Sequence, residues 1–176
     1  MSKLFISANR FLNESFLLAD KIYESNFNPD IVIGIWRGGS IPAIVIHEFL
    51  QFRGLKTKYA VITTRSYTGI GEQSEHVDVD ISENVLGELI NANNILIVDD
   101  VLDTGKTIEA IYRYFKNNNI TGKIKVASVY YKPATSSILP DYYIHETNKW
   151  IVFPHELEGL LPDEIKNKHL DLSMDH

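Results

Sequence analysis

Cysteine is absent from the 176-residue sequence, which excludes disulfide bonds, thiol nucleophiles and zinc sites with cysteine ligands. No apolar run approaches the length that crosses a bilayer, so we expect no membrane span. The first residues, MSKLFISANRF, lack the long apolar stretch that follows the basic residue of a secretory signal. Together these absences lead us to expect a cytoplasmic protein.

Basic residues are too few to favour a polyanionic partner. The chain has 17 Lys and Arg against 23 Asp and Glu, which gives a formal net charge of -6. It also lacks a basic stripe and a DNA-binding motif, so we expect no nucleic acid partner. The six histidines have no metal-ligand spacing, and no G-x-S-x-G elbow indicates a serine hydrolase.

What is present is the composition of one ordinary globular domain, which we expect to span residues 1–176. Hydrophobic residues make up 44% and charged residues 23%, so the chain can bury a sizeable core. Apolar runs rich in β-branched residues predict strands at 30–35, 58–64, 94–100, 123–132, 142–146 and 150–153. Helical spacing predicts helices at 7–25, 40–54 and 107–119.

The alternation of these elements predicts an α/β fold with a mainly parallel twisted sheet flanked by helices. Ser7 and Ser40 are the expected N-caps of the first two helices, and Gly54 is the expected stop of the second. In such sheets, ligands bind beyond the carboxyl ends of the strands. This rule brings segments 36–39, 65–80 and 99–107 to one edge.

Segment 65–80 (RSYTGIGEQSEHVDVD) is polar and contains glycine, and it is too long for an ordinary connection. Such lengths are typical of functional loops that a rigid scaffold positions. The sequence therefore predicts a flexible loop over the ligand-binding edge of the sheet.

The stretch ILIVDDVLDTGKT (95–107) ends like a nucleotide-binding loop and yet contains three aspartates. A G-x-x-x-x-G-K-[ST] loop requires glycine five residues before Gly105, and that position is Asp100. A carboxylate there would repel the β-phosphate of a nucleoside triphosphate. The sequence therefore does not fit an ATPase or a GTPase.

The same stretch resembles the PRPP-binding signature of type I phosphoribosyltransferases, in which four apolar residues, two acids and two apolar residues precede a phosphate loop. The resemblance implies the type I phosphoribosyltransferase fold, with a small hood formed by the N- and C-terminal segments. Donors at a helix N-terminus suit the 5′-phosphate, and carboxylates suit the ribose hydroxyls. The implied PRPP contacts are Asp99, Asp100, Thr104, Gly105, Lys106 and Thr107.

Two further segments resemble parts of the family that contact PRPP. IWRGGSIP resembles its pyrophosphate loop, where a cation and backbone donors face the leaving diphosphate. In relatives the peptide entering this loop is often cis, which here would be Trp36–Arg37. RSY resembles the start of the flexible catalytic loop of 6-oxopurine enzymes, which we place at 65–80. These likenesses imply PRPP contacts at Arg37, Gly38, Gly39, Ser66 and Tyr67.

The base site follows from the same resemblance. Enzymes for hypoxanthine, guanine and xanthine have an acid at the position of Asp103, where it takes or shares the purine N7 proton as N9 attacks C1′. YYKP places Lys132 beside the 6-oxo group. In the expected base-binding hood region, 133–160, KWIVFPHE places the Trp150 ring on the base and the Ile151 carbonyl near the 2-position.

The resemblance also implies Mg²⁺ as cofactor. Carboxylate oxygens are ligands that this ion prefers. Asp99 and Asp100 would support it, and Glu156 falls near a late family acid with the same role, although that acid is more often Asp.

We therefore expect a purine salvage enzyme that uses PRPP and a 6-oxopurine and releases pyrophosphate with IMP, GMP or XMP. The resemblance also implies a homo-oligomer, either a dimer or a tetramer. Two alternatives stay open: a phosphoribosyltransferase for uracil or adenine, and a PRPP- or nucleotide-sensing regulator of the same fold. Asp103 and the intact RSY sequence argue against the regulator.

Overall fold

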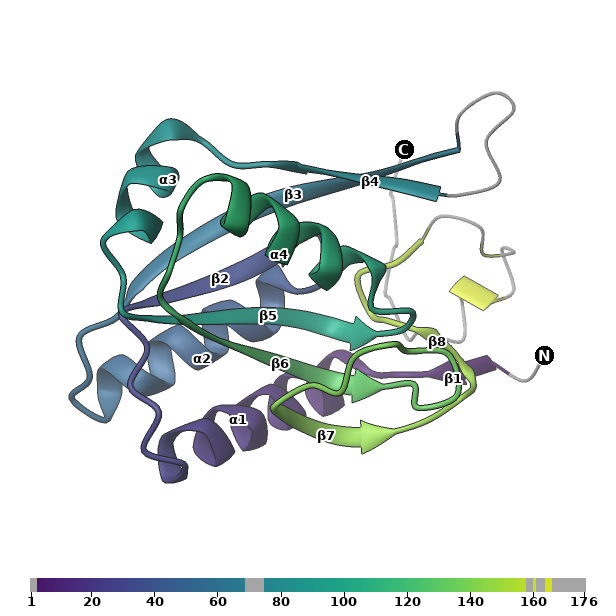
Figure 1. Cartoon of the computed structure of the whole chain (residues 1–176). Helices are drawn as coiled ribbons and strands as arrows, with labels where there is room; N and C mark the ends of the chain where they lie inside the picture. Colours follow the sequence, from purple (N-terminus) through teal and green to yellow (C-terminus); the bar gives the residue numbers. More distant parts are fainter. Residues whose placement is uncertain (1–2, 69–74, 158–159, 161–163, 166–176) are drawn as a thin grey trace, which may run out of the picture.

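The computed structural model describes residues 3–68, 75–157, 160 and 164–165 (Figure 1). The main sheet contains β2 (Ile31–Trp36), β3 (Lys58–Thr68), β4 (Glu75–Asp80), β5 (Asn94–Leu102), β6 (Lys123–Tyr131) and β7 (Tyr142–Glu146). Their order is β4-β3-β2-β5-β6-β7, and neighbouring strands are parallel except for β3 and β4. The predicted α/β fold with a mainly parallel sheet is confirmed.

Helices cover both faces of this sheet (Figure 1). One face carries α1 (Ala8–Glu24) and α2 (Ser40–Phe52), and the other carries α3 (Glu83–Ile90) and α4 (Lys106–Asn117). None of the helices in the described part of the chain is long and apolar enough to cross a membrane.

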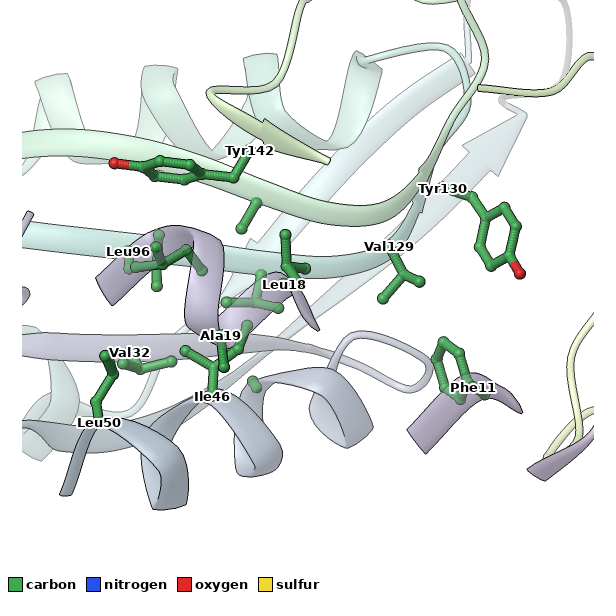
Figure 2. Packing of buried hydrophobic residues seen from close by; sticks show 14 of the residues in the cluster. Phe11, Leu18, Ala19, Val32, Ile46, Leu50, Leu96, Val129, Tyr130 and Tyr142 are labelled. Atoms are coloured by element: carbon green, nitrogen blue, oxygen red, sulfur yellow. The ribbon is translucent and has the colours of Figure 1, made fainter. Parts of the chain in front are cut away.

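The core under α1 and α2 consists of aliphatic side chains that interdigitate with those of the sheet. Figure 2 shows side chains from both helices meeting those of β2, β5 and β6. All are fully buried: Leu18, Ala19, Val32, Ile46, Leu50, Leu96 and Val129. Buried apolar surface contributes about 25 cal/mol per Å², so this layer fixes the strands firmly against the helices. The loops at the strand ends are thereby held on a rigid frame.

Helix boundaries follow local chemistry. Ser7 caps α1 as predicted, since its hydroxyl accepts a hydrogen bond from the Arg10 N–H at 3.2 Å. The expected cap at Ser40 was wrong, because α2 begins at Ser40 itself and Gly39 is the N-cap. Gly54, at a φ of 88°, ends the segment in the left-handed region that suits glycine, as predicted.

Segment 65–80 is not a structureless loop at its two ends, which corrects the prediction. β3 continues to Thr68, and residues 63–68 pair antiparallel with residues 75–80 of β4. The physical reason is alternation, since Val77 is buried and Val79 packs on the core while Asp78 and Asp80 are exposed. The predicted flexible catalytic loop otherwise falls on residues 69–74, which lie outside the described residues.

A second, two-stranded sheet brings a strand near the N-terminus beside a strand that follows the main sheet in sequence. β1 (Lys3–Phe5) pairs in parallel with β8 (Trp150–Val152), with Leu4 opposite Ile151. This sheet lies beyond the carboxyl ends of β5, β6 and β7 (Figure 1). The N- and C-terminal segments that the resemblance assigned to a hood therefore lie together in β1 and β8 near the predicted ligand edge. The expected hood region 133–160 is too long, however, because β7 within it pairs with β6 in the main sheet.

Candidate active site

The turn between β5 and α4 has the form of an anion-binding loop. Gly105 is the N-cap of α4 and has a φ of 85°, a conformation that L side chains rarely adopt. Gly105 has no side chain to cap α4, and the Lys106 N–H, the first of the helix, donates to the Thr104 hydroxyl at 3.4 Å. The N-terminus of α4 also carries the positive end of the helix dipole. Thr104 and Lys106 flank Gly105 and are exposed. The geometry suits a phosphate group.

The loop after β2 packs directly on the end of β5. A Cβ atom on Gly38 would overlap the carboxylate of Asp100, and one on Gly39 would overlap the backbone at Val98 and Asp99. At Gly39, where the neighbouring atoms are backbone, only glycine permits this approach. The peptide that enters the loop, Trp36–Arg37, is cis, a point that the sequence left open.

The two acids at the end of β5 share a poorly solvated position. Asp100 is 8% exposed, and its Oδ1 accepts the Val101 N–H at 2.7 Å. Burial raises the pKa of Asp99 well above its ordinary value, and the adjacent Asp100 carboxyl raises that pKa further. The pair is thus placed where a cation would relieve its electrostatic cost.

A cavity of 240 Å³ opens between these segments. Its lining combines the β2 loop, the β5 acids and the start of α4 with the chain after β8, through Arg37, Gly38, Asp99, Asp100, Thr107, His155 and Glu156. A second cavity of 280 Å³ shares Arg37 and Glu156 with the first and adds Trp150 from the hood. The predicted PRPP loops and the hood therefore enclose adjoining spaces.

Asp103 follows the last residue of β5, and its carboxylate, unlike those of Asp99 and Asp100, is paired with a lysine. The ammonium nitrogen of Lys132 is 2.5 Å from Asp103 Oδ2, and the Thr135 hydroxyl donates to Oδ1 at 2.8 Å. Burial raises the pKa of the Asp103 carboxyl, but the hydrogen bonds from Lys132 and Thr135 and the Lys132 charge outweigh it, so the net pKa is lowered. Lys132 Nζ also lies 5.7 Å from the ring centroid of Trp150, which is 55% exposed.

Comparison with known proteins agrees with this arrangement. The family model of the phosphoribosyl transferase domain matches residues 8–159. The chain belongs to the phosphoribosyltransferase family. The solved purine phosphoribosyltransferase from Pyrococcus horikoshii is 34% identical, with a TM-score of 0.75 over 92% of this chain and 99% of that one.

Two curated relatives carry the name xanthine-guanine phosphoribosyltransferase. The protein from Cereibacter sphaeroides is 32% identical over 72% of this chain and 68% of its own length. The protein from Desulfotalea psychrophila is 30% identical over 88% of this chain and 86% of its own length.

The carboxylates of this phosphoribosyltransferase fit magnesium only with help from a substrate. Asp99 and Asp100 offer the oxygen ligands that Mg²⁺ prefers. Across the described residues, however, no three His, Asp or Glu side chains are grouped closely enough to hold a metal by themselves. Mg²⁺ commonly takes its remaining ligands from substrate phosphates and water, so the pair suits an ion that arrives with PRPP.

The structure brings most of the predicted site residues to one edge. The exceptions concern Ser66, Tyr67 and Glu156. The backbones of Ser66 and Tyr67 lie in β3, but their side chains are outside the described part. Glu156 lines the cavity, yet its carboxylate accepts the Phe153 N–H at 3.2 Å and does not join the two aspartates in a metal-binding group. Its magnesium role stays a prediction.

Two residues at the site were missed by the sequence analysis. His155 lines the cavity, and its Nε2 lies 3.5 Å from Asp100 Oδ2. Its position next to Glu156 was the signal that could have singled it out. Thr135 had no such signal, because its contact with Asp103 spans 32 residues.

Proposed function

We propose that this phosphoribosyltransferase transfers the 5-phosphoribosyl group of PRPP to N9 of hypoxanthine, guanine or xanthine. The observation that carries the proposal is the Asp103–Lys132 pair beside Trp150. It offers a proton acceptor, a donor for a 6-oxo group and an aromatic face in one place. The names of the curated relatives support the same substrate class.

The reaction forms one bond and breaks one bond at C1′. Purine N9 attacks C1′, and the bond from C1′ to the diphosphate oxygen breaks with its electron pair leaving on the diphosphate. The N7 proton passes to the Asp103 carboxylate. The products are pyrophosphate and IMP, GMP or XMP.

The remaining residues of the edge bind and orient PRPP. The N-terminus of α4, from Gly105 to Thr107, binds the 5′-phosphate, and Arg37 faces the leaving diphosphate. Asp99 and Asp100 accept hydrogen bonds from the ribose hydroxyls. Mg²⁺ held by these aspartates and PRPP oxygens would supply positive charge to the leaving diphosphate.

Lys132 distinguishes 6-oxopurines from adenine because it can donate hydrogen bonds to two acceptors, the Asp103 carboxylate and the purine O6. In the free protein it is buried to 9% exposure and donates to Asp103. A 6-oxopurine brings a second acceptor, O6, so the hold of Lys132 on Asp103 weakens and the carboxylate becomes more basic as N7 approaches. Adenine brings a 6-amino donor and leaves a Lys132 N–H unpaired.

A turnover screen tests the proposal. Purified protein with PRPP and Mg²⁺ is assayed with hypoxanthine, guanine, xanthine, adenine and uracil, and release of pyrophosphate is measured for each. We expect kcat/KM for the best 6-oxopurine to exceed that for adenine and uracil by at least about 10³-fold. Adenine or uracil as best substrate would establish the alternative enzyme. Binding of PRPP without turnover of any base would establish the regulator.

A further inference from the structure

The segment that follows β6 is held against the turn that carries Asp103. Lys132 N–H donates to the Leu102 carbonyl at 3.0 Å, and Ser137 N–H donates to the Thr104 carbonyl at 3.0 Å. These bonds attach residues 132–137 to the chain on both sides of Asp103. The segment is therefore fixed by hydrogen bonds both to the phosphate loop, at Thr104, and to the end of β5 beside Asp103.

Between these two anchors, a turn carries Thr135. The Thr135 N–H donates to the Lys132 carbonyl at 3.3 Å, so two side-chain partners of Asp103 come from the two ends of one turn. The Thr135 hydroxyl lies 2.8 Å from Asp103 Oδ1 and 2.9 Å from the Asp103 backbone carbonyl. The single hydroxyl proton is shared between these two acceptors, so Thr135 lies against both the carboxylate and the backbone of Asp103 and limits rotation of that side chain.

The two carboxylate oxygens of Asp103 consequently have different partners. Oδ2 faces Lys132, which also lies near Trp150, and Oδ1 is held by Thr135 on the other side. A 6-oxopurine competes for Lys132 but offers nothing that replaces the Thr135 hydroxyl. When Lys132 turns to O6, Thr135 is the partner that remains on the carboxylate.

We propose that Thr135 is a positioning residue for transfer, which fixes the Asp103 carboxylate while Lys132 moves from it to the purine. The inference rests on the proposed function, because it assigns Asp103 the N7 proton. Thr135 acts through Asp103 and needs no contact with the base. Its removal therefore slows the chemical step and leaves the 5′-phosphate loop in place.

Three variants test this role. Thr135→Val keeps the shape and removes the hydroxyl, Thr135→Ser keeps the hydroxyl, and Ser136→Ala removes a neighbouring hydroxyl that bonds the Ile138 carbonyl. For Thr135→Val we expect kcat to fall roughly tenfold with KM for PRPP within about twofold, since one hydrogen bond to a charged group is lost. Thr135→Ser should recover at least about a third of the wild-type kcat, and Ser136→Ala should match wild type.

The pH profile separates positioning from mere folding. The Thr135 hydroxyl lowers the pKa of Asp103, and Lys132 is the charged group in direct contact with that carboxylate among the described residues. Loss of the hydroxyl should move the acid limb of kcat/KM to higher pH in Thr135→Val but not in Thr135→Ser. A folded Thr135→Val protein with wild-type kcat and an unmoved limb overturns the inference, as does a Thr135→Ser protein that behaves like Thr135→Val.

Carbon-detected NMR of the Asp103 carboxyl, assigned with Asp103→Asn, keeps the two proposals distinguishable. Its titration in the free protein needs no turnover. If wild type turns over none of the five bases, the proposed function fails, and an upward shift of the carboxyl pKa in Thr135→Val still supports the contact. If wild type is active and this pKa does not move, the role of Thr135 fails alone.

Discussion

The acids at the end of β5 and the acid in the turn after it are neighbours in sequence and opposites in environment. Asp99 and Asp100 sit together under the β2 loop, where burial and mutual repulsion raise the pKa of Asp99. Asp103 is partly exposed and held by Lys132 and Thr135, so its pKa is lowered. The single acid is paired with a lysine at 2.5 Å, whereas the paired acids accept backbone N–H groups and have His155 at 3.5 Å from Asp100.

The largest effect expected from this contrast is loss of activity without magnesium. Two carboxylates lie side by side here, and Mg²⁺ would offset their charge and that of the diphosphate, so PRPP should bind and react only with the ion. Excess chelator should lower turnover by at least about 10³-fold, and added Mg²⁺ should restore it. Full activity in chelator would show that the pair has another use.

The next largest effect concerns the choice of base, which we attribute to Lys132, the partner of Asp103. Adenine leaves a Lys132 N–H unpaired, so its kcat/KM should be at least about 10³-fold below that of the best 6-oxopurine. Lys132→Ala should narrow this gap mainly by impairing the oxopurines. Steady-state kinetics with both base types measures the change.

Trp150→Ala is the matched control for Lys132, because an aromatic face stacks on any purine. It should weaken all bases similarly, by about 1–3 kcal/mol. If Trp150→Ala weakened binding of the 6-oxopurines alone, Lys132 would not be the residue that discriminates between the bases.

The smallest effect is on stability. The raised pKa of Asp99 means that the folded protein binds more protons than the unfolded chain between the two pKa values. The stability that this group contributes is present below about pH 4, the ordinary Asp range, and is lost as pH rises through the raised pKa. Asp99→Asn should therefore stabilise the free protein at pH 7 by about 1 kcal/mol, or roughly 2–4 °C in Tm.

Thermal unfolding of wild type and Asp99→Asn at pH 7 and at low pH checks whether the substitution stabilises or destabilises the protein. The Tm gain of Asp99→Asn should shrink toward zero at acid pH, where wild-type Asp99 is protonated in both states. A variant that is less stable than wild type at pH 7 would show that the carboxylate is satisfied by the fold.

The PRPP loop was readable from the sequence because its residues are contiguous. Every position from Asp99 to Thr107 belongs to one strand, one turn and one helix start, so the pattern determined the placement. Lys132 and Trp150 could be placed by spacing after that pattern. Thr135 could not, because it meets Asp103 only through the turn that follows β6.

The secondary structure was less readable where local patterns compete. In segment 65–80, polar and glycine residues indicated a loop, while the alternation in HVDVD gave a strand. α3 was not predicted at all, although Ser82 caps it and Leu89 is buried. β1 was missed because three residues give too short a pattern, and its partner, β8, lies at the other end of the chain.

The division of labour between the two acidic positions is tested most directly by comparing Asp103→Asn with Asp100→Asn in one pair of assays. Calorimetry measures binding of PRPP with Mg²⁺, and single-turnover kinetics measures transfer to hypoxanthine or guanine. Asp103→Asn should bind PRPP as wild type does and react roughly 10²-fold more slowly or worse, whereas Asp100→Asn should lose PRPP affinity. Loss of PRPP affinity in Asp103→Asn with the transfer rate intact would contradict the account.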